Sequence, residues 1–114
     1  MISSKLMVRD IERRIISRFM DLLILSILDH DGSEISGYDL IKYFHSKFGL
    51  LMSPGTVYSC MHAMEREDFL KGKYNGKKRV YTLTQHGRET ARIIQKGEAR
   101  ILMFMSKFLC KAEH

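Results

Sequence analysis

The sequence predicts a mainly α-helical fold with one small β-hairpin, which places it in the α+β class. Two observations predict this fold. Apolar residues recur at helical spacing over most of the chain, and one short segment, residues 69–83, flanks an Asn-Gly pair with strand-forming residues. The chain has 114 residues, of which 45% are hydrophobic, enough for one core. We therefore expect a single domain over residues 1–114.

Composition restricts the class of protein. Lys and Arg number 19 and Asp and Glu 13, and this net charge of +6 favours an acidic partner. The longest apolar run, residues 20–28, is far shorter than the roughly 20 residues that span a bilayer, and residues 1–10 lack a signal peptide. We expect a cytoplasmic protein with no membrane partner, in which Cys60 and Cys110 are free thiols.

The first expected element is an N-terminal helix within residues 1–30. Ile11, Ile15 and Phe19 recur at helical spacing, followed by Leu22. From residue 20 onward nearly every side of this helix is apolar, which predicts burial all round. The helix should end in the stretch 30–33.

A second and a third helix are expected within residues 36–67. Ser36 and Asp39 have the spacing of a capping box at the start of the second helix, and Gly49 is placed to close it in the left-handed conformation. The pair Ser53–Pro54 marks the next start, with serine as N-cap and proline in the first turn.

The third helix has two different faces. At about 100° per residue, Val57, Met61 and Met64 share a core-facing side with Cys60. The other side carries small residues instead of the long Lys and Glu of a solvated helix, so its axis can approach a partner closely. This suits a helix in the DNA major groove, although an ordinary solvated helix is the alternative. The expected contacts are Thr56, Ser59 and His62 to base edges and Arg66 to a phosphate, with Gly55 and Ala63 allowing the close approach.

Residues 69–83 predict a β-hairpin closed by a two-residue Asn75–Gly76 turn, in which both central residues need positive φ. Such a turn would pair Tyr74 with Lys77, Lys73 with Lys78 and Leu70 with Tyr81. Leu70, Tyr81 and Leu83 would then face the core, and Lys71, Lys73 and Lys78 would share the opposite face.

Positive charge is concentrated in this hairpin. Residues 69–88 contain six cations and no Asp or Glu. Two lysines directly across from each other repel, and a phosphate along that face would relieve the repulsion. The alternative is a lysine-rich edge that discourages the addition of further strands.

Three helices followed by a basic hairpin form the arrangement of a winged helix-turn-helix. Three strings in this arrangement, Gly37–Ile41, Phe48–Tyr58 and Lys78–Arg88, resemble the PadR family of transcriptional regulators. The most specific part is Ser-Pro-Gly-Thr-Val-Tyr, and the resemblance covers residues 20–90 approximately. It implies a dimeric DNA-binding repressor without catalytic activity.

The resemblance also implies where DNA would bind. The segment from Ser53 would be the recognition helix, residues 71–79 would be the wing, and Tyr38 would touch the DNA backbone. Two residues depart from the family pattern: Asp68 stands where the family usually has glycine, and Tyr74 alone gives the first wing strand its aromatic character. The expected DNA-binding residues are Tyr38, Ser53, Pro54, Gly55, Thr56, Tyr58, Ser59, His62, Arg66, Lys71, Lys73, Lys77, Lys78 and Arg79.

Residues 84–114 predict a C-terminal dimerisation helix with Thr84 as N-cap. The apolar run 101–105 covers more than one face, and a helix at the end of a small domain buries only one face on its own core. Gly97 would permit close packing on a partner; the alternative is a helix folded back on its own domain. The expected dimer interface comprises Ile15, Phe19, Leu22, Ile94, Ile101, Phe104, Met105 and Phe108.

These expectations combine into a function. A homodimer would read an inverted repeat in double-stranded DNA, with half-sites about one helical turn apart, and would repress transcription by occluding a promoter. Any small-molecule effector would bind at the dimer interface. No histidine has metal-ligand spacing with a cysteine and no nucleophile motif occurs, so neither a metal, a cofactor nor enzyme activity is expected. The alternative is a protein-interaction module whose basic hairpin binds an acidic protein surface.

Overall fold

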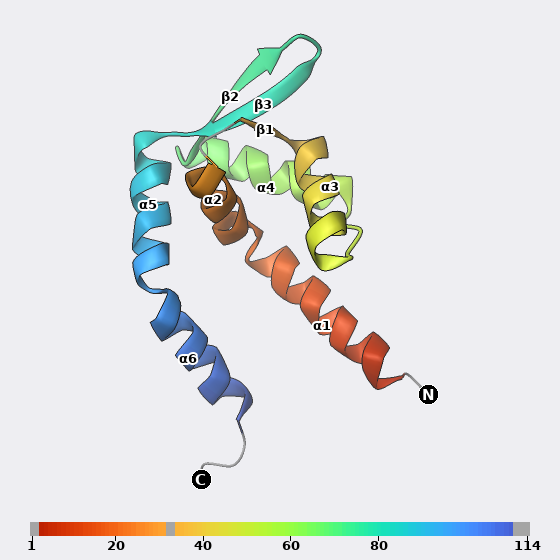
Figure 1. Ribbon diagram of the computed structural model, residues 1–114. Coiled ribbons are helices and arrows are strands. Elements are labelled where there is room, and N and C mark those ends of the chain that lie inside the picture. The colour runs from red at the N-terminus through yellow and green to blue at the C-terminus, as the bar shows by residue number, and fades with distance from the viewer. Residues whose placement is uncertain (1–2, 32–33, 111–114) are drawn as a thin grey trace.

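A computed structural model describes residues 3–31 and 34–110, which form six helices and three short strands (Figure 1). The expected loop residues Gly32 and Ser33 and the last four residues lie outside these ranges. The elements are α1 (Ser4–Arg18), α2 (Met20–Asp31), β1 (Ile35–Ser36), α3 (Gly37–Phe48), α4 (Pro54–Arg66), β2 (Leu70–Asn75), β3 (Lys78–Leu83), α5 (Gln85–Lys96) and α6 (Glu98–Leu109). The predicted class, mainly helical with a small antiparallel sheet, is confirmed.

The elements form a central bundle with three projections. Helices α2, α3, α4 and α5 pack together below the sheet, and the β2–β3 hairpin projects from one end. Helices α1 and α6 extend from the opposite end as two separate arms (Figure 1). The molecule is therefore elongated, with extents of 53 × 34 × 22 Å.

The core lies where α2, α3 and α4 meet the sheet. The predicted core face of α4 is confirmed, because Val57, Met61 and Met64 are buried. Phe48, at the end of α3, lies outside this core and is 36% exposed. The buried hydrophobic cluster comprises Ile16, Met20, Ile24, Leu25, Leu28, Ile35, Leu40, Phe44, Leu50, Met52, Val57, Met61, Met64, Leu70, Tyr81 and Ala91.

The helix starts follow the predicted capping signals. Ser36 and Asp39 form a reciprocal capping box with two hydrogen bonds of 3.1 Å, and the Thr84 hydroxyl accepts a hydrogen bond from the Gly87 amide. Ser53 is the N-cap of α4, but its hydroxyl makes no capping hydrogen bond. The start of α4 is therefore set by Pro54 in the first turn, whose fixed φ suits a helix.

Residues 4–31 form two helices instead of the single predicted N-terminal helix. The helix breaks at Phe19, and the next backbone amides bond irregularly: the Leu22 amide donates both to the Phe19 carbonyl and to the Asp21 carboxylate. A short acidic side chain that competes for backbone amides weakens the helical ladder. The break directs α1 away from the core. The predicted burial of α2 all round is wrong: Ile24, Leu25 and Leu28 are buried, whereas Ser26 and His30 are exposed.

The predicted C-terminal helix is also two helices, α5 and α6, with the break at Gly97. The Gly97 amide donates to the carbonyls of both Ile93 and Ile94 at 3.1 Å, so the regular ladder is interrupted there. Glycine has low helix propensity because it loses more backbone conformational entropy on folding than other residues do. The predicted role of Gly97 in close packing on a partner remains a prediction.

The sheet has three strands in the order β1-β3-β2, and β1 was not predicted. This strand has only two residues, Ile35 and Ser36, which pair with Tyr81 and Val80. Two residues are too few to show the alternation by which a strand is recognised in a sequence. The short strand nevertheless connects the start of α3 to the hairpin.

The predicted hairpin register is wrong. Asn75 pairs with Lys78, so the turn residues are Gly76 and Lys77, and Lys73 lies opposite Val80 instead of Lys78. Gly76 has φ of 70°, and a turn that needs positive φ only at its first central residue can place glycine there without strain. The predicted core face is nevertheless confirmed, since Leu70 pairs with Leu83 and both lie on the same face as Tyr81.

Asp68, one of the two residues that depart from the family pattern, has φ of 66° and is the one non-glycine residue with positive φ in the described ranges. Its backbone is held there, because its carbonyl accepts a hydrogen bond from the Thr84 hydroxyl at the base of the hairpin. Left-handed backbone is disfavoured for residues with a Cβ, most of all for β-branched ones.

We expect Asp68→Val to lower the free energy of unfolding by about 1–2 kcal/mol, and Asp68→Gly to change it by less than about 1 kcal/mol. Urea unfolding followed by circular dichroism measures both. Glu67→Val is the matched control, since its φ is an ordinary −87°. Equal losses for valine at positions 67 and 68 would show that the backbone at Asp68 is not strained.

Candidate nucleic-acid interface

One side of α4 is an exposed surface of small and polar residues. All eight of its residues that were predicted to bind DNA are exposed: Ser53, Pro54, Gly55, Thr56, Tyr58, Ser59, His62 and Arg66. The opposite side is anchored in the core through Val57, Met61 and Met64. We call this exposed surface, from Ser53 to Arg66, the α4 face.

The α4 face continues onto the start of α3 through Tyr58. A Cβ at Gly37 would overlap the Tyr58 ring, so the absence of a side chain there allows the ring to pack against α3. Next to it, Tyr38 is exposed, and the Lys42 ammonium lies 4.8 Å from the centre of its ring. Tyr38 and Tyr58 thus lie near each other, which is necessary if both belong to one interface.

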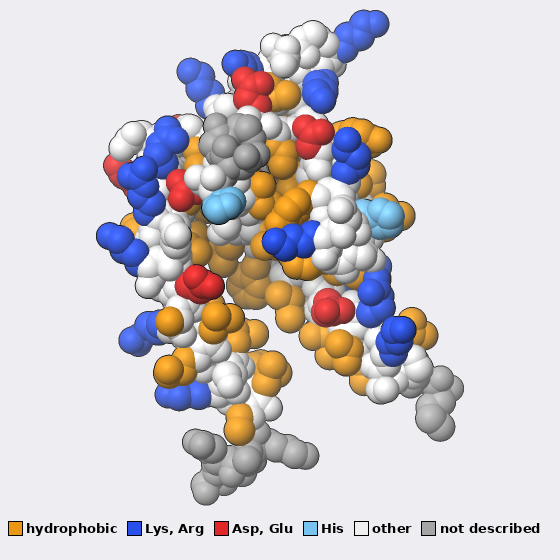
Figure 2. All heavy atoms as spheres, in the orientation of Figure 1, with side chains coloured by type: hydrophobic (Ala, Val, Ile, Leu, Met, Phe, Trp, Pro, Cys, Tyr) orange, Lys and Arg blue, Asp and Glu red, His pale blue; other side chains and the backbone are white. Residues whose placement is uncertain are grey.

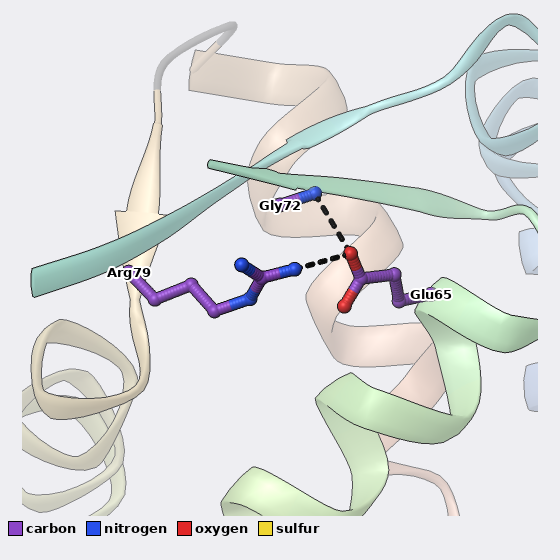
Figure 3. Close-up of polar contacts among 3 residues, drawn as sticks. All are labelled: Glu65, Gly72 and Arg79. Carbon is purple, nitrogen blue, oxygen red and sulfur yellow. Dashed lines mark hydrogen bonds and ion pairs between the residues drawn. The ribbon is translucent and has the colours of Figure 1, made fainter. Parts of the chain in front are cut away.

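One carboxylate of α4 binds both strands of the hairpin, in addition to the packing of Leu70 and Tyr81 in the shared core. Glu65 accepts a hydrogen bond from the Arg79 guanidinium at 2.6 Å and another from the Gly72 amide at 3.3 Å, both at the same oxygen (Figure 3). A Cβ at Gly72 would lie within 3 Å of the guanidinium, so only glycine leaves room for it. These contacts connect the last turn of α4 to both strands of the wing.

Arg79 therefore has a structural partner, whereas the sequence placed it among the DNA contacts. Its guanidinium is half-buried between the rings of Tyr74 and Tyr81, at 5.4 and 5.6 Å from their centres. Glu65 was not singled out from the sequence. The acid-free stretch 69–88 gave no signal of it, because the partner comes from the preceding helix.

The wing lysines differ in their surroundings. Lys71, Lys73, Lys77 and Lys78 are all exposed. Lys73 forms an ion pair of 2.7 Å with Glu34, which precedes β1. This pair and Glu65–Arg79 are the two ion pairs in the described part of the chain. Figure 2 shows Lys and Arg side chains at the upper end of the molecule, where the hairpin projects, and also along its flanks and both arms.

A second carboxylate, that of Asp39, lies near this surface at the start of α3. The hydrogen bond from the Ser36 amide lowers its pKa below the ordinary value; burial is the next largest effect and opposes this, and the Ser36 hydroxyl, Lys78 and Lys42 lower the pKa further by smaller amounts. Asp39 is thus ionised at neutral pH and stabilises the first turn of α3.

Neither cysteine belongs to a metal site in the described ranges, which contain no cluster of three or more His, Cys, Asp or Glu able to hold a metal ion. Both thiols are free. Burial, together with the nearby Asp21 and Glu67 carboxylates, raises the pKa of the Cys60 thiol to about 11. Cys60 therefore stays protonated at neutral pH, as a small hydrophobic residue on the buried side of α4.

The residues predicted to form a dimer interface lie along α1, α2, α5 and α6. Five of them, Ile15, Phe19, Ile101, Phe104 and Phe108, are exposed, and Leu22, Ile94 and Met105 are half-buried. Figure 2 shows hydrophobic side chains along both arms and on the surface between them. None of the helices described is long and apolar enough to span a membrane.

The comparison with known families agrees with this geometry. The family model described as "Transcriptional regulator PadR-like family" matches residues 24–93, more than half of the chain. The matched range includes α3, α4 and the wing, and excludes α1 and α6. No protein with a curated description is significantly similar to this chain.

Solved structures share the fold. A transcriptional regulator from Clostridium thermocellum is 21% identical, with a TM-score of 0.70 over 96% of this chain and 100% of that one. A PadR family regulator from Clostridium difficile R20291 is 26% identical, with a TM-score of 0.69 over 81% and 99% of the two chains. Bacillus subtilis PadR in complex with operator DNA is 27% identical, with a TM-score of 0.54 over 66% of this chain and 45% of that longer one.

The fold is thus a winged helix, in which α4 and the β2–β3 hairpin lie at one end of the domain. Within that class, the chain belongs to the PadR-like family of transcriptional regulators, as the resemblance of its sequence predicted.

We expect Glu65→Ala to loosen the wing, because it removes the acceptor of both Arg79 and the Gly72 amide. The free energy of unfolding should fall by about 1 kcal/mol, and hydrogen exchange of the Gly72 amide should accelerate. Glu67→Ala is the control, since Glu67 is the C-cap that directly follows α4. Unchanged exchange at Gly72 in Glu65→Ala would contradict the role of Glu65 as the wing anchor.

Proposed function

We propose that this chain is a sequence-specific regulator that binds double-stranded DNA as a homodimer and represses transcription from an inverted-repeat operator. The observation that carries the proposal is the α4 face: an exposed helix surface of mostly small and polar residues, at the end of the domain from which a lysine-rich hairpin projects. A helix of this kind fits the major groove, while a basic hairpin is drawn to the adjacent phosphates.

The contacts divide into two kinds. Thr56, Ser59 and His62 would read base edges, because they are exposed near the middle of α4. Phosphate contacts would come from the ends of the surface: Arg66, Lys71, Lys77 and Lys78, with Tyr38 at the start of α3. Ser53, Pro54, Gly55 and Tyr58 would shape the first turn of α4 for a close approach. The operator complex of Bacillus subtilis PadR supports DNA binding by similarity.

A second copy of this chain is the proposed partner of α1 and α6. Helix α6 has no buried residue, although Leu102, Phe104 and Phe108 lie on it and are more than half exposed. Large apolar residues concentrated on two arms are typical of a surface covered by another subunit. Isologous contact between the arms would give a two-fold dimer, which presents two copies of α4 to two inverted half-sites.

Repression and its release follow from the same arrangement. A dimer bound across a promoter would exclude the transcription machinery. The groove of about 630 Å³ between α2, α5 and α6, lined by Leu22, Ile94 and Ile101, adjoins the proposed interface. A small apolar effector would bind there and change how the two subunits sit on DNA.

Substitutions on the α4 face and on the wing should separate the two kinds of contact. Lys77→Gln and Lys78→Gln should each flatten the slope of log affinity against log salt by about 0.9 without changing base preference. Thr56→Val and Ser59→Ala should leave that slope unchanged and reduce discrimination against mismatched operators by about 1 kcal/mol.

Duplexes enriched from random sequences on the purified protein supply the operator, and titration at several salt concentrations measures both effects. Lys96→Gln, at the end of α5, is the control for the lysine variants. Absence of any enriched motif, with affinity unaffected by all four substitutions, would favour a protein-interaction module over a DNA-binding regulator.

Phe104→Asp should weaken the homodimer at least about tenfold, because it places a charge in the apolar surface to be buried. The side chain is 65% exposed in the single chain, so its replacement leaves the core intact. Analytical ultracentrifugation measures the dissociation constant. Ile93→Asp, at a 70% exposed position on α5 outside the proposed interface, is the matched control. Equal dimerisation by the two variants would contradict the proposed interface.

A further inference from the structure

One wing lysine is paired with a carboxylate that comes from outside the wing. Glu34 Oε1 lies 2.7 Å from Lys73 Nζ, and 62% of the lysine side chain and 35% of the glutamate side chain remain exposed to solvent. The two residues are 39 positions apart in the sequence, and the fold alone brings them together.

The strand order explains how the contact forms. Because β3 lies between β1 and β2, the residues Ser36, Val80 and Lys73 are aligned across the sheet. Side chains two residues apart share a face, so Glu34, Lys71 and Lys73 project from the same side. This is the side opposite Arg79 and Tyr81, which face α4 and the core. Glu34 therefore places a negative charge on the lysine-bearing face of the wing.

The two carboxylates that reach the wing have different surroundings. Glu65 is held by Arg79 and by a backbone amide, and the aromatic rings beside the guanidinium keep this contact partly from water. Glu34 has a single partner in the described part of the chain, and that partner is mostly exposed. The first contact is structural, whereas the second can exchange with another anion at little cost.

We propose that Glu34 masks Lys73, acting as an internal substitute for a DNA phosphate. The proposal rests on the DNA-binding function above. While Glu34 holds the lysine, the wing makes one phosphate contact fewer, and sequence-independent attraction to DNA is weaker. Because backbone contacts carry no sequence information, the base-reading residues of α4 then account for a larger share of the affinity. Glu34 is thus a specificity-determining residue that need not touch DNA.

Mixed-sequence duplex DNA of about two helical turns is the probe, titrated over a range of salt with the full chain. Glu34→Gln should bind about two- to fivefold more tightly at low salt, and its slope of log affinity against log salt should steepen by about 0.9, one additional contact. Lys73→Gln should keep the wild-type slope. The double variant Glu34→Gln with Lys73→Gln should show the same slope as Lys73→Gln.

Glu67→Gln is the control, since it removes one exposed negative charge near the end of α4 and leaves the wing ion pair intact. A gain for Glu34→Gln that equals the gain for Glu67→Gln, or that persists in full without Lys73, would overturn the masking role and show general repulsion. Lys77→Gln separates the two proposals. If Lys77→Gln flattens the slope while Glu34→Gln changes nothing, only the masking proposal is wrong. If neither the wild-type protein nor any variant binds DNA, the proposed DNA-binding function is wrong as well.

Discussion

The candidate interface depends on the Glu65 carboxylate, the group on α4 that binds both strands of the hairpin. A two-stranded ribbon alone is marginally stable in water. Here Arg79 and the Gly72 amide share one oxygen of Glu65, and the guanidinium also lies over the rings of Tyr74 and Tyr81. The orientation of the wing relative to α4 is therefore set by a charged contact supported by aromatic packing.

The contact of Glu65 with Arg79 affects how the positive charge of the wing is interpreted. Six cations lie between residues 69 and 88 without one acidic residue, yet the fold supplies two carboxylates from elsewhere in the chain. Glu65 is the ion-pair partner of Arg79, and Glu34 is that of Lys73. Lys71, Lys77 and Lys78 have no ion-pair partner within the described ranges. The positive surface formed by the unpaired wing cations is thus smaller, and limited to fewer residues, than the net charge of +6 indicates.

Local signals predicted most of the fold. Ser36 with Asp39, Pro54 and Thr84 each act through groups within a few residues, so their helix starts can be read from the sequence. The sequence did not predict the helix breaks at Phe19 and Gly97 or the two-residue strand β1, because each gives only a weak local pattern. The prediction of the hairpin register was wrong for a related reason, because Asn75–Gly76 and Gly76–Lys77 are both acceptable turns. The contact of Arg79 with Glu65 is compatible with the register that the structure adopts.

The candidate site divides in the same way. The exposed residues of α4 follow from helical periodicity, because the buried Val57, Met61 and Met64 fall on one side and the small and polar residues on the other. The partners of Lys73 and Arg79 depend on contacts across 39 and 14 residues, which periodicity does not contain. The wing thus carries two opposite constraints. It must be fixed firmly to α4 for the two surfaces to act together, and its exposed lysines must stay exchangeable for phosphates to bind. A half-buried Arg–Glu contact on one face and an exposed Lys–Glu contact on the other satisfy both.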